Sequence, residues 1–186
     1  MQDDVRRSAT YADLEAVPPN LVAELVGGEL LTHPRPRLRH SLSYSGLGVF
    51  LSGPFQYGRG GPGGWWILDE PELHLGQDVL VPDLAGWRRE RMPEVPDDAF
   101  STVAPDWVCE IVSPSTAIHD RGAKRDIYAR HGVKHLWLVD PDSRLLEAFE
   151  LAGEHWLLLK TFTNSESIDA APFAAAPFDL NLLWAD

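Results

Sequence analysis

The chain has 186 residues, 44% of them hydrophobic, which suits one domain over residues 1–186 with a sizeable core and excludes a disordered chain. The formal net charge of −12 argues against a protein that coats DNA regardless of sequence, because phosphate contacts need Lys and Arg. The single cysteine, Cys109, excludes an internal disulfide framework and a cysteine-based zinc site.

The sequence carries no sign of export or of membrane insertion. No apolar run approaches the roughly 18–20 residues that span a bilayer. The N-terminal stretch MQDDVRRSATYADLEAVPP lacks the apolar centre of a signal peptide. We therefore expect a cytoplasmic protein with no membrane partner.

The first third of the chain predicts a hairpin and a helix. ELVGGELL at 24–31 has the pattern of two short strands with Gly27-Gly28 at a tight turn. HSLSYSGLGVFLSG at 40–53 is compatible with a helix, although its glycines weaken that prediction. Between them, HPRPRLRH at 33–40 gathers three arginines and two histidines, a cluster that on its own is typical of solvated surface.

Strand-like runs fill the middle of the chain. They are rich in β-branched, aromatic and leucine residues and are short, as strands usually are. In chain order they are WWIL (65–68), ELHL (72–75), VLVPDLAGW (79–87) and DWVCEIV (106–112). The last is apolar at successive positions, which is typical of a strand buried on both faces of a sheet.

The second half of the chain predicts a strand–helix–strand unit and a hairpin. Residues 117–133 have the pattern of a helix of about three turns that Gly132 ends. HLWLVDP at 135–141 is a second buried strand, so we expect it to run parallel to 106–112. Residues 144–162 then predict an antiparallel hairpin. The expected fold is α/β, with a mixed β-sheet core flanked by helices, an N-terminal hairpin and a C-terminal β-hairpin.

Two acids interrupt apolar strand-like runs. Asp83 follows Pro82, and proline in a sheet usually marks an edge or a bulge, which are common beside active sites. Glu110 lies in the most apolar run, where a carboxylate without a partner is costly to bury. Paired carboxylates are ligands for Mg²⁺ or Mn²⁺. A salt bridge for each acid, or exposure at a strand end, is the structural alternative.

A third group of polar residues lies on the helix that follows Glu110. Asp120, Lys124 and Tyr128 are spaced i, i+4 and i+8, so they share one helix face. Lys124 would bring a positive charge to the two acids, which phosphoryl-transfer sites use to stabilise developing charge. The alternative is a surface Asp–Lys pair worth a few tenths of a kcal/mol. Ser-Pro-Ser-Thr at 113–116 has no Gly-x-Ser-x-Gly pattern, which excludes a serine hydrolase.

Residues 79–141 hold these features in a specific order. The order is Pro82-Asp83, Glu110 in an apolar strand, Ser-Pro-Ser-Thr, Asp120, Lys124, Tyr128 and HGVKHLWLVDP. It resembles the Uma-type putative restriction endonuclease family, a branch of the PD-(D/E)XK nuclease superfamily with a restriction endonuclease-like fold. The resemblance extends over most of the chain, from ELVGGELL to FDLNLLW.

The resemblance implies a role for individual residues. Asp83 matches the aspartate of the Pro-Asp motif and Glu110 matches the acid of the (D/E)XK motif. The lysine of that motif is replaced by Val112, which implies that Lys124 on the next helix takes its place. Glu24 matches the glutamate before the hairpin, and His40 matches the histidine that opens the first helix.

The combined expectation is a Mg²⁺- or Mn²⁺-dependent endonuclease that acts on DNA. Asp83, Glu110 and the backbone carbonyl of Ile111 are the expected metal ligands, and Lys124 assists the attacking water or the developing charge. A non-catalytic nucleic-acid-binding or protein-interaction module on the same fold is the alternative. By analogy with enzymes that cut duplexes as symmetric pairs, the C-terminal hairpin is a candidate homodimer contact.

Overall fold

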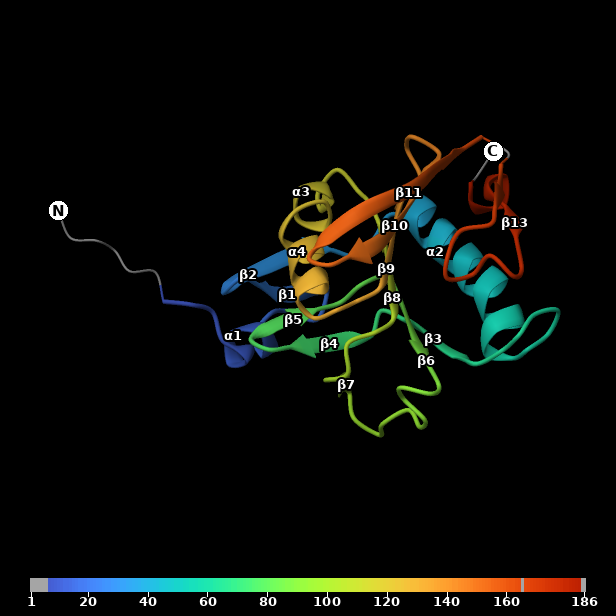
Figure 1. Ribbon diagram of the computed structural model, residues 1–186. Helices are drawn as coiled ribbons and strands as arrows, with labels where there is room; N and C mark the ends of the chain where they lie inside the picture. The colour runs from blue at the N-terminus through green and yellow to red at the C-terminus, as the bar shows by residue number, and fades with distance from the viewer. Residues whose placement is uncertain (1–6, 165, 185–186) are drawn as a thin grey trace.

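The computed structural model describes residues 7–164 and 166–184, which form two larger β-sheets with helices packed around them (Figure 1). The helices are α1 (Tyr11–Glu15), α2 (Leu38–Leu51), α3 (Ala117–Asp120) and α4 (Ala123–Arg130), with a π-helical turn η1 (Ser52–Gln56) and a 3₁₀ turn η2 (Leu180–Leu183). Among the described residues, none of the helices has the length and hydropathy of a membrane span.

A six-stranded mixed sheet forms the centre of the molecule. Its strands in spatial order are β11 (His155–Thr163), β10 (Leu145–Ala152), β9 (His135–Asp140), β8 (Trp107–Ile111), β6 (Leu84–Arg88) and β3 (Trp65–Asp69). Strands β8 and β9 are parallel and α3 and α4 connect them, which confirms the predicted strand–helix–strand unit. Strands β10 and β11 form the predicted antiparallel hairpin.

A five-stranded sheet carries the N-terminal hairpin. Its strands in spatial order are β2 (Glu29–Pro34), β1 (Leu21–Val26), β5 (Asp78–Leu80), β4 (Glu72–Leu75) and β7 (Phe100–Ser101). The hairpin turn lies at Gly27 and Gly28, whose φ angles of +60° and +84° suit glycine. Strands β12 (Ser167–Ile168) and β13 (Phe178–Asp179) form a separate small sheet near the C-terminus.

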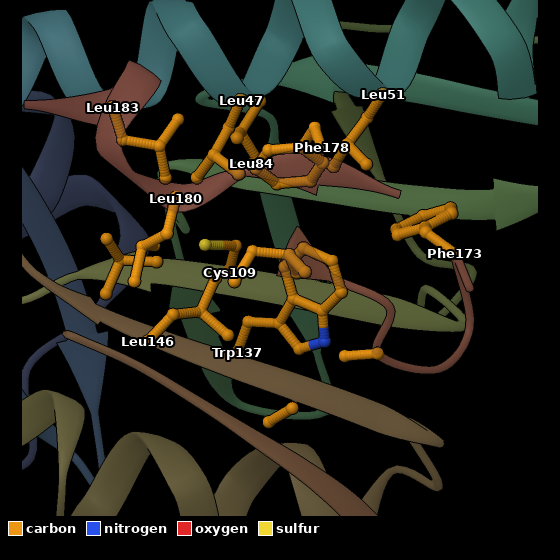
Figure 2. Packing of buried hydrophobic residues seen from close by; sticks show 14 of the residues in the cluster. Leu47, Leu51, Leu84, Cys109, Trp137, Leu146, Phe173, Phe178, Leu180 and Leu183 are labelled. Carbon is orange, nitrogen blue, oxygen red and sulfur yellow. The ribbon is translucent and has the colours of Figure 1, made fainter. Parts of the chain in front are cut away.

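The six-stranded sheet is covered on both faces, and alternate residues of β8 point to opposite sides. Trp107, Cys109 and Ile111 belong to the core that packs beneath α2 and the C-terminal segment (Figure 2). Val108 belongs to the second core, which lies between this sheet, α4 and the five-stranded sheet. Cys109 is fully buried, and burial raises the pKa of its thiol well above the usual range. The prediction of a doubly buried strand is therefore confirmed.

Two predicted elements are each broken in the structure. The run 79–87 is not one strand, because β5 and β6 belong to different sheets and the chain crosses between them at Val81–Asp83. Pro82 has no N–H to continue a ladder there. Asp83 therefore lies in a link before β6. The prediction that it lies inside a strand is wrong.

The predicted helix over 117–133 is likewise two helices, because α3 ends at Asp120 and α4 begins at Ala123. Gly122 lies between them with φ −118° and ψ −110°. A Cβ atom at this position would come within 2.7 Å of the Ile118 carbonyl oxygen, so the close approach of the two segments requires glycine. Gly132 follows α4 with a φ of +74°, as its predicted role at the helix end requires.

Candidate active site

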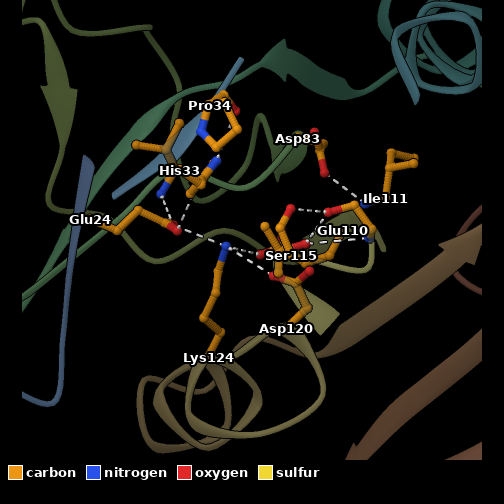
Figure 3. A network of polar contacts seen from close by, with 12 residues as sticks. Glu24, His33, Pro34, Asp83, Glu110, Ile111, Ser115, Asp120 and Lys124 are labelled. Carbon is orange, nitrogen blue, oxygen red and sulfur yellow. Dashed lines mark hydrogen bonds and ion pairs between the residues drawn. The ribbon is translucent and has the colours of Figure 1, made fainter. Parts of the chain in front are cut away.

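Lys124 lies at the centre of a buried cluster of charged residues (Figure 3). Its side chain extends from α4 towards β1 and β8, and it is 3% exposed. The Nζ atom is 2.9 Å from Oε1 of Glu24, 2.9 Å from Oε1 of Glu110 and 3.6 Å from Oδ1 of Asp120. Burial lowers the pKa of Lys124, but the surrounding carboxylates raise it well above its usual value. Lys124 is therefore a permanent ammonium ion.

Glu24 is brought to this cluster by β1, from the five-stranded sheet. Its Oε1 atom accepts a 2.8 Å hydrogen bond from the Val81 backbone N–H. Its Oε2 atom lies 3.6 Å from Nε2 of His33, on the opposite strand of the hairpin. Burial raises the pKa of Glu24, but Lys124, His33 and the Val81 amide together lower it to about 2. The contacts of Glu24 therefore favour its ionised form.

Glu110 contacts the same lysine, but its pKa shifts in the opposite direction from that of Glu24. It is 2% exposed, and its Oε1 atom accepts a 2.6 Å hydrogen bond from the hydroxyl of Tyr128. Burial raises its pKa well above the usual value, and the charges of Asp120, Asp83 and Glu24 act in the same direction. The attraction of Lys124 is too small to offset them. Glu110 therefore lies where additional positive charge would be favourable.

Asp83 is fixed by contacts on both of its carboxylate oxygens. Oδ2 accepts a 2.6 Å hydrogen bond from the Ile111 backbone N–H, which ties the link before β6 to the end of β8. Oδ1 lies 3.2 Å from Nε2 of His40 on α2. Burial lowers the pKa of His40, but Asp83 and the nearby backbone of Ile111 raise it above the ordinary value. His40 thus lies beside both Asp83 and the backbone of Ile111.

The cluster borders a cleft of about 800 Å³. Asp83, Glu110, Asp120 and Lys124 line its floor, and the Ser-Pro-Ser-Thr link at 113–116 forms part of its wall. Burial raises the pKa of Asp120 despite the opposing effect of Lys124. Three carboxylates therefore surround one lysine, and Asp83 adds a further carboxylate to the cleft lining. Among the described residues, no group of three or more His, Cys, Asp or Glu side chains is arranged to hold a metal ion.

The candidate site residues predicted from the sequence all lie in or beside this cluster. Sequence reasoning missed two of the cluster's contacts. His33 could have been found, since the hairpin register pairs Glu24 with Leu31 and places His33 two residues further along the same strand. The hydrogen bond from the Val81 amide to Glu24 was not predicted, because residues 79–87 were expected to form one continuous strand.

Comparisons with known proteins agree on the family and the fold. The family model Uma2, described as "Putative restriction endonuclease", matches residues 8–182. The fold is similar to the 1.96 Å crystal structure of a putative nuclease of the DUF820 family from Anabaena variabilis, with a TM-score of 0.76 and 19% sequence identity. The alignment covers 94% of this chain and 97% of that one, which confirms the predicted fold class. No curated protein matches the chain.

Proposed function

Because this chain belongs to the Uma2 family of putative restriction endonucleases, we propose that it is a metal-dependent nuclease that hydrolyses phosphodiester bonds of DNA. The observation that carries this proposal is the convergence of Asp83, Glu110 and Lys124 on one cleft. Three groups from separate parts of the fold are held there by directed contacts. Burial and neighbouring carboxylates raise the pKa of one of them, Glu110. Perturbed carboxylates in a cleft are typical of catalytic sites.

The donor set fits a hydrated Mg²⁺ or Mn²⁺ ion. Such ions bind proteins through one or two carboxylates and keep several water molecules, so a third acidic ligand is not needed. The Asp83 and Glu110 carboxylates and the Ile111 carbonyl would hold the ion, whose charge would offset the burial and the neighbouring carboxylates that raise the pKa of Glu110. A bound divalent cation lowers the pKa of a coordinated water and polarises a phosphodiester oxygen.

The remaining residues orient the cluster and balance its charge. The hydroxyl of Tyr128 holds one Glu110 oxygen, and the Ile111 amide holds one Asp83 oxygen, so both carboxylates are positioned before substrate arrives. Lys124 is placed to stabilise negative charge that develops on the phosphate oxygens or to orient the attacking water. Glu24 keeps the ammonium group at the cleft floor through its 2.9 Å ion pair.

Metal binding and cleavage should be measured on the same variants. Isothermal titration with Mn²⁺ should give a binding isotherm for the wild type that is lost in Asp83→Ala and in Glu110→Ala. Cleavage of plasmid DNA with Mg²⁺ or Mn²⁺ should be lost in both variants and strongly reduced in Lys124→Ala. Asp106→Asn is the matched control, because this buried carboxylate lies outside the cleft and holds the Arg88 amide.

Two outcomes would contradict the proposal in different ways. Unchanged Mn²⁺ affinity in both alanine variants would exclude Asp83 and Glu110 as metal ligands. Metal binding without cleavage of duplex DNA, single-stranded DNA or RNA would instead favour the alternative, a non-catalytic nucleic-acid-binding or protein-interaction module on the same fold.

A further inference from the structure

A basic segment borders the cleft on the side of the N-terminal hairpin. Arg35, Arg37 and Arg39 lie in the connection from β2 to the first turn of α2, and all three line the cleft that contains Asp83 and Glu110. Leu38, between the last two arginines, also lines the cleft and is 89% exposed. We refer to residues 35–39 as the basic lip.

The charges of the basic lip are not neutralised within the protein. Among the described residues, no salt bridge involves Arg35, Arg37 or Arg39. Arg35 donates a 3.2 Å hydrogen bond to the Pro19 carbonyl, which carries no charge. By contrast, Arg7, Arg91, Arg121 and Arg130 each pair with a carboxylate. The lip therefore presents three guanidinium groups that are available to an external anion.

The local sequence also keeps the first part of the lip, residues 35–37, extended. Pro34 and Pro36 restrict the backbone, and Arg37 has extended φ and ψ angles of −68° and 157° before α2 begins. In an extended chain, alternate residues lie about 6–7 Å apart. This spacing is comparable with the separation of neighbouring phosphates along a nucleic-acid strand. Arg35 and Arg37 are two residues apart in this extended part, so they can reach neighbouring phosphates, and Arg39 follows them in the first turn of α2.

Electrostatics require such a feature if a polyanion is to approach the cleft. The chain has a net charge of −12, and three carboxylates, those of Asp83, Glu110 and Asp120, line the cleft beside Lys124. A phosphodiester would be repelled from this floor unless cations at the rim offset the repulsion. Guanidinium groups suit this role because they donate paired hydrogen bonds to phosphate oxygens.

We propose that Arg35, Arg37 and Arg39 bind successive phosphates of the DNA strand that enters the cleft, while Leu38 packs against a base or sugar of that strand. Exposed leucines serve as apolar wedges in other DNA-binding proteins. The inference rests on the proposed nuclease function, because it assigns the strand-binding surface of the same cleft. We test it by measuring DNA binding in the absence of cleavage. The proposed role of the basic lip and the proposed nuclease function can then fail separately.

The test is the salt dependence of DNA binding in EDTA, where no divalent metal is available for cleavage. Fluorescence anisotropy with a labelled 30-mer, duplex or single-stranded, would be recorded across KCl concentrations. The triple variant Arg35→Gln, Arg37→Gln, Arg39→Gln should bind at least about tenfold more weakly at low salt. Its slope of log K against log[KCl] should be shallower by about 2.7 for a duplex or about 2.1 for a single strand.

The matched control removes the same charge from elsewhere on the surface. Arg7, Arg59 and Arg130 do not line the cleft, so their combined change to Gln should leave the slope within about 0.5 of the wild type. Equal effects of the two triple variants would overturn the proposal, because the response would then follow net charge alone. Failure of the wild type to bind either DNA would overturn it as well.

Leu38→Ala tests the apolar contact separately. This change should weaken binding several-fold and leave the salt slope unchanged, since no phosphate contact is lost. An unchanged affinity would exclude the contact proposed for Leu38. If DNA binding depends on the basic lip but the protein cleaves no nucleic acid, the DNA-binding role of the lip is supported and the proposed nuclease activity is contradicted. Unchanged Mn²⁺ affinity in the lip variants would confirm that the metal-binding residues are intact.

Discussion

Glu24 and Glu110 share Lys124 as a partner at 2.9 Å, yet their pKa values shift in opposite directions. The difference follows from their other neighbours. Glu24 also accepts from the Val81 amide and lies near His33, whereas Glu110 faces Asp83 and Asp120. Glu24 therefore stabilises the folded state as an anion, whereas the surroundings of Glu110 disfavour its ionised form. Shifts of this kind are common at functional sites.

Glu110→Gln should stabilise the metal-free protein at pH 7. The pKa of Glu110 is raised in the folded state, so ionisation of this group opposes folding at any pH above its unfolded pKa, and an uncharged amide removes that cost. We expect Tm to rise by about 2–4 °C, which corresponds to about 1 kcal/mol for a chain of this size. Differential scanning calorimetry in EDTA measures this change. A lower Tm for the variant would contradict the inference that ionisation of Glu110 opposes folding.

Glu24→Gln should have the opposite effect, with a distinct pH dependence. The pKa of Glu24 falls from 4.5 to about 2 on folding, so its stabilising contribution is complete above pH 4.5 and is lost as the pH falls towards 2. At pH 7 we expect a loss on the order of 2–3 kcal/mol in the free energy of unfolding. Urea titrations at pH 7, 5 and 4 should show the difference from wild type narrowing at the acid end. A constant difference would argue against this assignment.

The sequence was informative about individual acids only where their surroundings were unusual. Glu110 could be singled out because a carboxylate in an apolar strand needs a partner, and the i, i+4, i+8 spacing placed Lys124 and Tyr128 on one helix face. The partner of Glu24 could not be read in this way, because its contact with Lys124 joins residues that are distant in the chain. Such contacts depend on how the two sheets pack.

At the level of elements, periodicity located most strands and helices but not the points where they break. The apolar pattern of residues 79–87 continues across the change from one sheet to the other, so hydrophobicity gives no sign of it. Pro82 was the available signal, and it indicated a bulge where the structure has a crossing. The break between α3 and α4 likewise depends on a close backbone approach at Gly122 that pattern alone does not predict.

Gly122→Ala tests the importance of that break. The added methyl group would lie 2.7 Å from the Ile118 carbonyl oxygen, so α3 and α4 must move apart. We expect a loss of about 1–3 kcal/mol, as for other overpacked sites, together with weaker metal binding because Asp120 and Lys124 lie on either side of the break. Chemical denaturation and Mn²⁺ titration measure the two effects. Gly53→Ala is the control, since a methyl group there meets no atom within 4 Å.

At the level of the whole molecule, β11 is an edge strand of the six-stranded sheet, and three consecutive leucines on it are exposed. They are Leu157, Leu158 and Leu159, with exposed fractions of 54%, 46% and 42%. An exposed apolar edge is a template for strand pairing. We therefore expect a homodimer through β11, which Leu158→Lys should convert to a monomer. Light scattering coupled to gel filtration gives the mass, and a wild-type monomer at high micromolar concentration would exclude this contact.

The crossing at Val81–Asp83 also limits when the cluster can exist during folding of the chain. Glu24 comes from the five-stranded sheet, Glu110 from the six-stranded sheet and Lys124 from α4, so no single one of these elements contains the cluster. A chain in which only one of the two sheets has formed therefore has no assembled cluster.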